Sequence, residues 1–116
     1  MNYLKRLMEN AADIKPELDL LTEEYMERYY FYKARDEILR YSNQGFYRAA
    51  STLLDASRAE FGIEETKEIA KDALEALRRI YFQWMGSGLH AEACELRNYL
   101  EMICRSFDIE MNLGDS

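Results

Sequence analysis

The chain has 116 residues, enough for one domain around a single core, and 48% of them are apolar and 32% charged. One proline and five glycines are too few for the frequent turns of a β-sheet, so we expect long helices. The formal net charge of −7 argues against direct nucleic-acid binding, which depends on clustered Lys and Arg. No apolar run reaches the roughly 20 residues of a membrane span, so we expect no membrane partner.

The cysteines indicate the compartment. Cys94 and Cys104, the only two, fall in one predicted helix about 15 Å apart along its axis, which is too far for a disulfide. Without a disulfide framework a reducing compartment is favoured. The N-terminal residues mix charged and apolar side chains, unlike a signal peptide. We therefore expect a cytoplasmic protein.

Apolar residues recur at helical spacing in five stretches. Pro16 separates the first two stretches, because proline disfavours helix at the residue before it. Glycines at Gly45, Gly62 and Gly88 separate the others. The predicted helices cover residues 2–13, 17–42, 46–61, 64–85 and 89–107. The pattern predicts an all-α fold, a four- or five-helix bundle of antiparallel helical hairpins, with one domain over 1–107 and a frayed C-terminal tail over 108–116.

The helix predicted at 17–42 has an unusually wide apolar surface. Tyr25, Tyr29 and Tyr32 lie on one side, and Met26 and Tyr30 lie on another. A helix with such a surface is covered on two sides. It is either the central helix of the domain or a helix with one side turned towards a partner.

Tyrosine is abundant, with nine in the chain. A buried tyrosine needs a hydrogen-bond partner for its hydroxyl, whereas tyrosine is enriched at interfaces that are wet when free. We therefore expect a protein-binding surface formed by Tyr25, Tyr29, Tyr32 and Tyr47. The alternative is that these rings form the boundary layer of the core, with their hydroxyls in water.

A faint repeat relates the two halves of the chain. A shift of 43 residues aligns Gly45 with Gly88 and Ala50 with Ala93. In each half the glycine lets the chain reverse, and the alanine lets the second helix pack closely on the first. Three further pairs align in the same way: Tyr41 with Trp84, Phe46 with Leu89, and Leu53 with Leu96.

The segment from Tyr41 to Ser57 has a spaced pattern of glycine, aromatic, alanine, large apolar and small residues. These residues are Gly45, Tyr47, Ala50, Leu54 and Ser57. The pattern resembles the turn and second helix of a tetratricopeptide hairpin, which implies peptide or protein binding on a concave helical surface. The chain departs from that family in three ways. Its period is 43 residues, whereas the period of the family is about 34. Ile38 lies at a position for a small residue, and Arg97 lies at a position for a large apolar one.

His90 is the only histidine, and Cys94 follows one helical turn later. Zinc needs at least three protein ligands, and Cys104 is too far along the helix to be the third. A single histidine also excludes a di-metal carboxylate bundle, and no phosphate-binding glycine loop is present. We therefore expect no metal, no cofactor and no enzymatic activity. A small enzyme or metal protein around His90 remains as a remote alternative.

The helix at 64–85 carries an acidic side formed by Glu64, Glu68, Asp72 and Glu75. Such an array suggests an inhibitor that mimics nucleic acid and binds a basic protein, although lysines are interleaved with it. The leading hypothesis is a non-enzymatic interaction module that uses the tyrosine-rich surface. Its partner is another protein or a second copy, in a homodimer or a larger complex.

Overall fold

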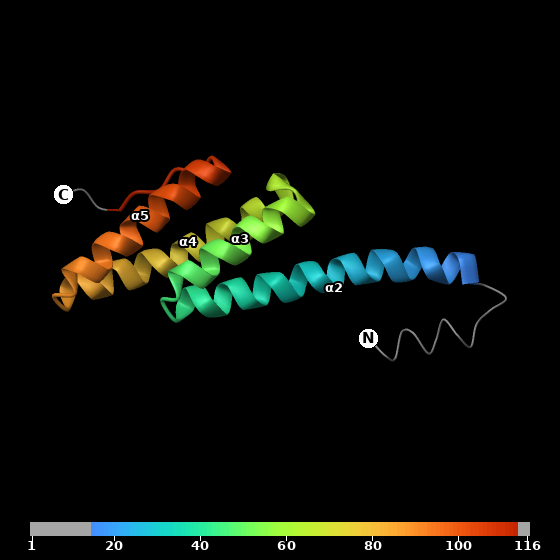
Figure 1. Ribbon diagram of the computed structural model, residues 1–116, viewed down its shortest axis with the longest axis horizontal. Helices are drawn as coiled ribbons and strands as arrows, with labels where there is room; N and C mark the ends of the chain where they lie inside the picture. The colour runs from blue at the N-terminus through green and yellow to red at the C-terminus, as the bar shows by residue number, and fades with distance from the viewer. Residues whose placement is uncertain (1–14, 114–116) are drawn as a thin grey trace. The chain divides into compact units, whose positions relative to one another are not determined.

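The computed structural model describes residues 15–113, which form four helices: α2 (Lys15–Asn43), α3 (Tyr47–Phe61), α4 (Ile63–Gly86) and α5 (His90–Phe107) (Figure 1). The all-α prediction is confirmed, and this part of the chain contains no strand. The bounds of these four helices differ from the predicted ones by no more than two residues. The helix expected at 2–13 lies outside the described residues. None of the four helices combines the length and the apolar character needed to cross a bilayer.

The chain divides into two compact units, the first ending at Lys33 and the second beginning at Ala34. Each unit is described by itself. In the first, the described side chains run from Glu23 to Lys33 along α2, and none of them is buried.

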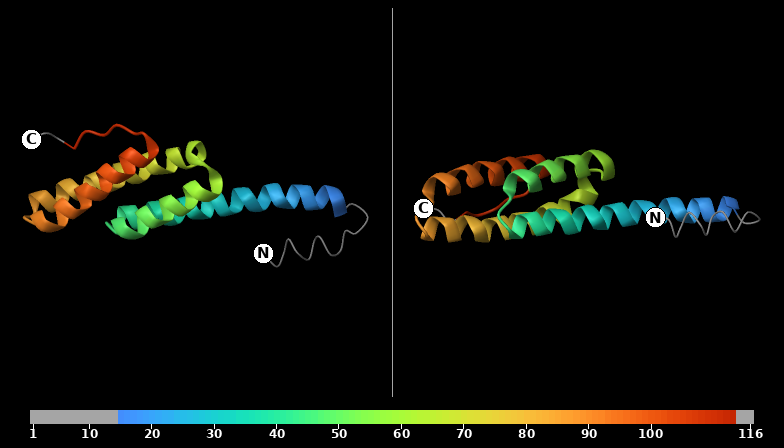
Figure 2. Two further views of the ribbon diagram at one scale, coloured as in Figure 1. Left: turned by 45° about the horizontal axis from the view of Figure 1, so that its top comes forward. Right: turned by 60° about the horizontal axis from the view of Figure 1, so that its bottom comes forward.

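In the second unit α4 is the central helix, because it packs against both α3 and α5 (Figure 2). The sequence left open whether the helix at 17–42 holds the central place, and in this unit α4 takes it. Small alanines on the inner side of α4 allow neighbouring helices to approach closely. Glu64 and Glu65 in its first turn are favourable for the helix dipole. The buried residues of α4 are Thr66, Ile69, Ala70, Ala73, Leu74, Ala76, Leu77 and Tyr81.

Helix α5 packs one side against this centre. The apolar spacing at 89–107 predicts a core side that includes Leu89 and Leu96; most of this side is buried, but Leu89 is exposed. Leu89 is the N-cap residue of α5, so it lies before the first helical turn and does not share the inner side of the helix. The buried residues of α5 are Ala93, Leu96, Leu100, Ile103 and Phe107.

The turns that precede α3 and α5 have the same backbone conformation. Gly45 and Gly88 are left-handed, with φ of 81° and 84°. The next residues, Phe46 and Leu89, have φ, ψ of −82°, 69° and −85°, 62°. In both turns the amide of this next residue donates a hydrogen bond to the carbonyl five positions earlier, at 2.9 Å. The two turns, 43 residues apart, therefore share one backbone geometry.

The surroundings of the two turn glycines differ. A Cβ atom at Gly45 would lie 3.1 Å from Cζ2 of Trp84 and 3.3 Å from Cγ2 of Ile80, so α4 lies directly against the first turn. A Cβ atom at Gly88 would have no neighbour within 4 Å. Among the described residues, the first turn is therefore covered by α4, and the second turn is open.

This difference predicts unequal costs for the same substitution. Gly88→Ala should lower the free energy of unfolding by about 1–2 kcal/mol, because alanine is strained in the left-handed region. Gly45→Ala should cost about 1–3 kcal/mol more, because its methyl group also crowds Trp84. Urea unfolding of both variants measures the difference. Equal losses would show that α4 does not pack on the first turn as described.

Candidate interaction surfaces

One side of α2 carries exposed tyrosines. Tyr25, Tyr29 and Tyr32 are spaced by four and three residues, so their side chains share one side of the helix. Their exposed fractions are 53%, 39% and 52%. The Lys33 ammonium lies 5.9 Å from the centre of the Tyr29 ring, within cation–π range. This tyrosine side of α2, formed by Tyr25, Tyr29 and Tyr32, is the aromatic surface that the sequence predicted for this helix.

Charged residues border the aromatic rings. Glu24, Glu27 and Arg28 are exposed on the same stretch of α2. Interfaces often combine an aromatic centre with a polar rim, because the rings supply apolar area and the charges keep the free surface hydrated. This stretch of α2 therefore combines exposed aromatic area with charged neighbours.

Tyr47 has a different environment from the other predicted tyrosines. It belongs to the second unit, where its half-buried ring contacts Trp84 of α4 and Tyr99 of α5, with ring centres 6.2 and 5.0 Å away. These edge-to-face and tilted contacts tie the start of α3 to both neighbouring helices. Tyr47 thus lies within the helix packing of the second unit, whereas Tyr25, Tyr29 and Tyr32 belong to the first.

An ion pair lies beside this aromatic cluster. Arg48 Nε donates to Glu95 Oε1 at 3.1 Å. This hydrogen bond, and next the interaction with the Tyr47 hydroxyl, hold the pKa of Glu95 below its ordinary value. Partial burial, helped by the nearby Glu95 charge, raises the pKa of Tyr47. The Arg48–Glu95 ion pair and the Tyr47–Tyr99 ring contact therefore join α3 to α5.

The lowered pKa of Glu95 predicts an acid-dependent contribution to stability. Because the folded pKa lies below the unfolded one, this contribution is present above about pH 4.3 and is lost as the pH falls through the folded pKa. Glu95→Gln should therefore flatten the decline in urea midpoint between neutral and acidic pH. Glu92→Gln, on an exposed position of the same helix, is the matched control. Identical pH profiles for the two variants would contradict the role of Glu95.

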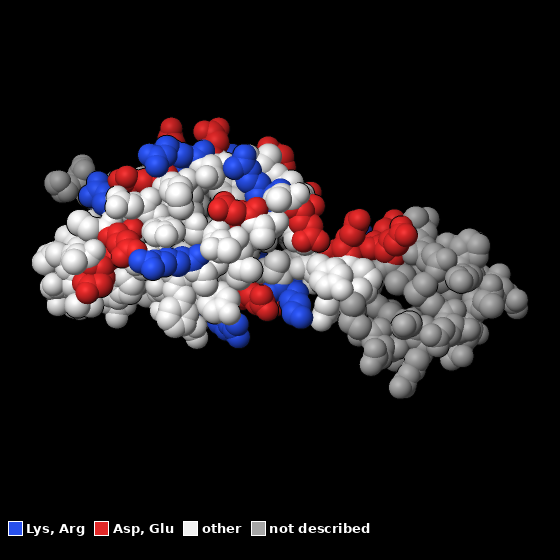
Figure 3. Space-filling view, in the orientation of Figure 1, with Lys and Arg blue, Asp and Glu red and all other residues white. Residues whose placement is uncertain are grey.

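The acidic side of α4 is solvent-exposed. Glu64, Glu68, Asp72 and Glu75 are all exposed, and Glu68 pairs with Lys71 at 3.3 Å. Figure 3 shows acidic and basic side chains interspersed on the face in view. The carboxylates are therefore available to a basic partner, but cations interrupt their array.

The residues around His90 do not form a ligand set. His90 and Cys94 are exposed, and Cys104 is half-buried, where burial raises the pKa of its thiol. Both cysteines are free. The alanines beside Cys94 in the sequence predict a packing side that buries its thiol, and this prediction is wrong, because Cys94 lies about 100° around the helix from the buried Ala93. Within residues 15–113 no group of three or more His, Cys, Asp or Glu side chains is placed to hold a metal.

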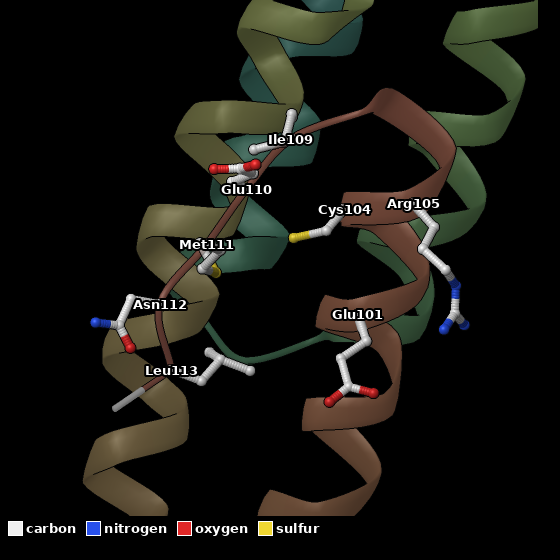
Figure 4. Close-up of a pocket in the computed structure, with 8 residues that line it drawn as sticks. All are labelled: Glu101, Cys104, Arg105, Ile109, Glu110, Met111, Asn112 and Leu113. Atoms are coloured by element: carbon white, nitrogen blue, oxygen red, sulfur yellow. The ribbon is translucent and has the colours of Figure 1, made fainter. Parts of the chain in front are cut away.

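A cleft of about 800 Å³ opens between α5 and the segment that follows it (Figure 4). Glu101, Cys104 and Arg105 of α5 line one wall, and residues 109–113 line the other. The sequence did not reveal this cleft, although the alternation of apolar and polar residues in 109–113 was a signal for an extended segment against a surface.

No protein-family model matches the chain, and neither a curated protein nor a solved structure with significant similarity to it was found. Candidate functions therefore come from the surfaces described above. These are the tyrosine side of α2, the acidic side of α4 and the cleft beside α5.

Proposed function

We propose that the chain is a non-enzymatic protein–protein interaction module that binds through the tyrosine side of α2. The observation that carries the proposal is the exposure of Tyr25, Tyr29 and Tyr32 on one side of a helix. Three large rings in contact with water leave apolar area that is favourable to bury, at about 25 cal/mol per Å². A surface of this kind supports association with an apolar surface of another protein.

The residue type supports binding rather than packing. Tyrosine has few rotatable bonds, so it loses little conformational entropy on binding, and its hydroxyl remains hydrated in the free state. The partner is a second copy of the chain or a helical surface of another protein, in a homodimer or a complex subunit. We further propose a cytoplasmic location, because the free Cys94 and Cys104 are compatible with a reducing compartment.

Replacing Tyr25 and Tyr29 together with serine tests this proposal. The double variant should lower the mass measured by light scattering, or abolish capture of a partner protein. Its urea midpoint should stay nearly unchanged, because exposed substitutions shift stability by about 0.5 kcal/mol or less. Phe46→Ser removes an equally exposed aromatic residue from the second unit and is the matched control. A wild-type protein that stays monomeric and partner-free at its highest soluble concentration would contradict the proposal.

A second candidate function is an inhibitor that binds a basic protein through the acidic side of α4. The exposure of Glu64, Glu68, Asp72 and Glu75 on one helix favours it. Salt distinguishes the two candidate functions, because dissolved ions screen exposed charges that lie farther apart than about 8 Å at physiological ionic strength. The same light-scattering measurement in high salt therefore distinguishes them, since an aromatic complex persists and a charge-driven complex dissociates.

A further inference from the structure

The second hairpin exposes positions that correspond to buried positions in the first. In the first hairpin Ser51 and Leu54 are buried on α3, which packs against α4. A shift of 43 residues relates these positions to Cys94 and Arg97, which are both exposed on α5. The turn at Gly88 is likewise open, whereas the first turn lies against α4. Within residues 15–113, the side of α5 that carries Cys94 and Arg97 is therefore not covered by a helix.

Residues 109–113 lie along part of this uncovered side. Asp108 has a left-handed φ of 53°, which ends α5 and reverses the chain. The Ile109 amide then donates to the Cys104 carbonyl at 2.9 Å. Figures 1 and 4 show the segment running back beside α5, antiparallel to it.

The segment is held in the way that proteins hold extended peptides. Ile109, Met111 and Leu113 are half-buried, and the alternate residues Glu110 and Asn112 are exposed, which is the period of two of an extended chain. One hydrogen bond to its main chain fixes the segment on α4, because Nε of Arg78 donates to the carbonyl of Asn112 at 2.7 Å. Main-chain hydrogen bonds with alternate apolar contacts are a recurring mode of peptide recognition.

The segment fills its site incompletely. The cleft of about 800 Å³ remains between it and α5. The Cys104 sulfur points into this space from α5, towards Met111 (Figure 4). A peptide with larger apolar side chains would fill more of this open cleft and would bury more apolar surface.

We propose that the side of α4 and α5 covered by residues 109–113 is a groove for an extended peptide of a partner protein with apolar residues at alternate positions. Residues 109–113 occupy it as an intramolecular ligand. The guanidinium of Arg78 selects an extended peptide over a helix, because carbonyls inside a helix already accept hydrogen bonds from their own helix. Phe82 and Met85, both exposed, continue the apolar surface of α4 beyond Arg78 and offer contacts to a peptide longer than the segment. This groove is independent of the tyrosine side of α2.

Alkylation of the two cysteines in the full chain tests the groove, with Cys94 as an internal control on the same helix. Cys104 should react more slowly than Cys94 in the wild type, because it is half-buried beside the segment. The full-length double variant Met111→Ser, Leu113→Ser should raise the Cys104 rate several-fold and leave the Cys94 rate unchanged. A synthetic peptide of residues 108–116 should restore protection, and it should bind this variant at least tenfold more tightly than the wild type, whose own segment competes.

A peptide in which serine replaces Ile109, Met111 and Leu113 is the matched control and should neither bind nor protect Cys104. A folded double variant that fails to bind the native peptide would overturn the proposal. If the double variant does not fold, the variant Arg78→Met tests the proposal instead, because it removes the hydrogen bond to the Asn112 carbonyl and leaves the sequence of the segment unchanged. Its Cys104 rate should rise while its Cys94 rate stays constant, and an unchanged Cys104 rate would overturn the proposal.

Discussion

The packing of α4 against both α3 and α5 is the constraint on which the second unit depends. A helix with neighbours on two sides must bury a wide arc, and α4 does so with alanines and larger apolar residues on the same inner side. The two left-handed turns at Gly45 and Gly88 return the chain so that α3 and α5 can reach α4. Tyr47 and the Arg48–Glu95 pair then tie the three helices together from the start of α3.

The helices of this chain could be predicted because so few residues interrupt its apolar periodicity. The apolar spacing at 64–85 predicts Ile69, Ala73 and Leu77 as core residues, and the structure buries Thr66, Ala70 and Leu74 as well. A single amphipathic stripe does not reveal a second neighbour, so local periodicity underestimates the buried arc of a central helix. Residues 109–113 were expected to belong to a frayed tail, and their contact with Arg78 joins positions 34 residues apart, which no local pattern encodes.

The two candidate binding surfaces differ in their physics. Within the described residues, the tyrosine side of α2 offers aromatic area and no side chain placed like Arg78 to bind a peptide carbonyl. It therefore suits a broad apolar partner surface, and the resulting complex should tolerate salt. The groove beside α5 combines a guanidinium donor with half-buried apolar contacts, so it suits one extended strand. The sequence grouped Tyr47 with the tyrosines of α2 because residue type alone does not tell which ring a neighbouring helix contacts.

Native-state hydrogen exchange in low denaturant tests the central role of α4 most directly. If α4 unites its neighbours, the slowest amides of α3, α4 and α5 should exchange with the same free energy of opening and the same denaturant dependence. Exchange of the slowest α3 amides through a lower-energy opening, while α4 and α5 remain protected, would contradict this account.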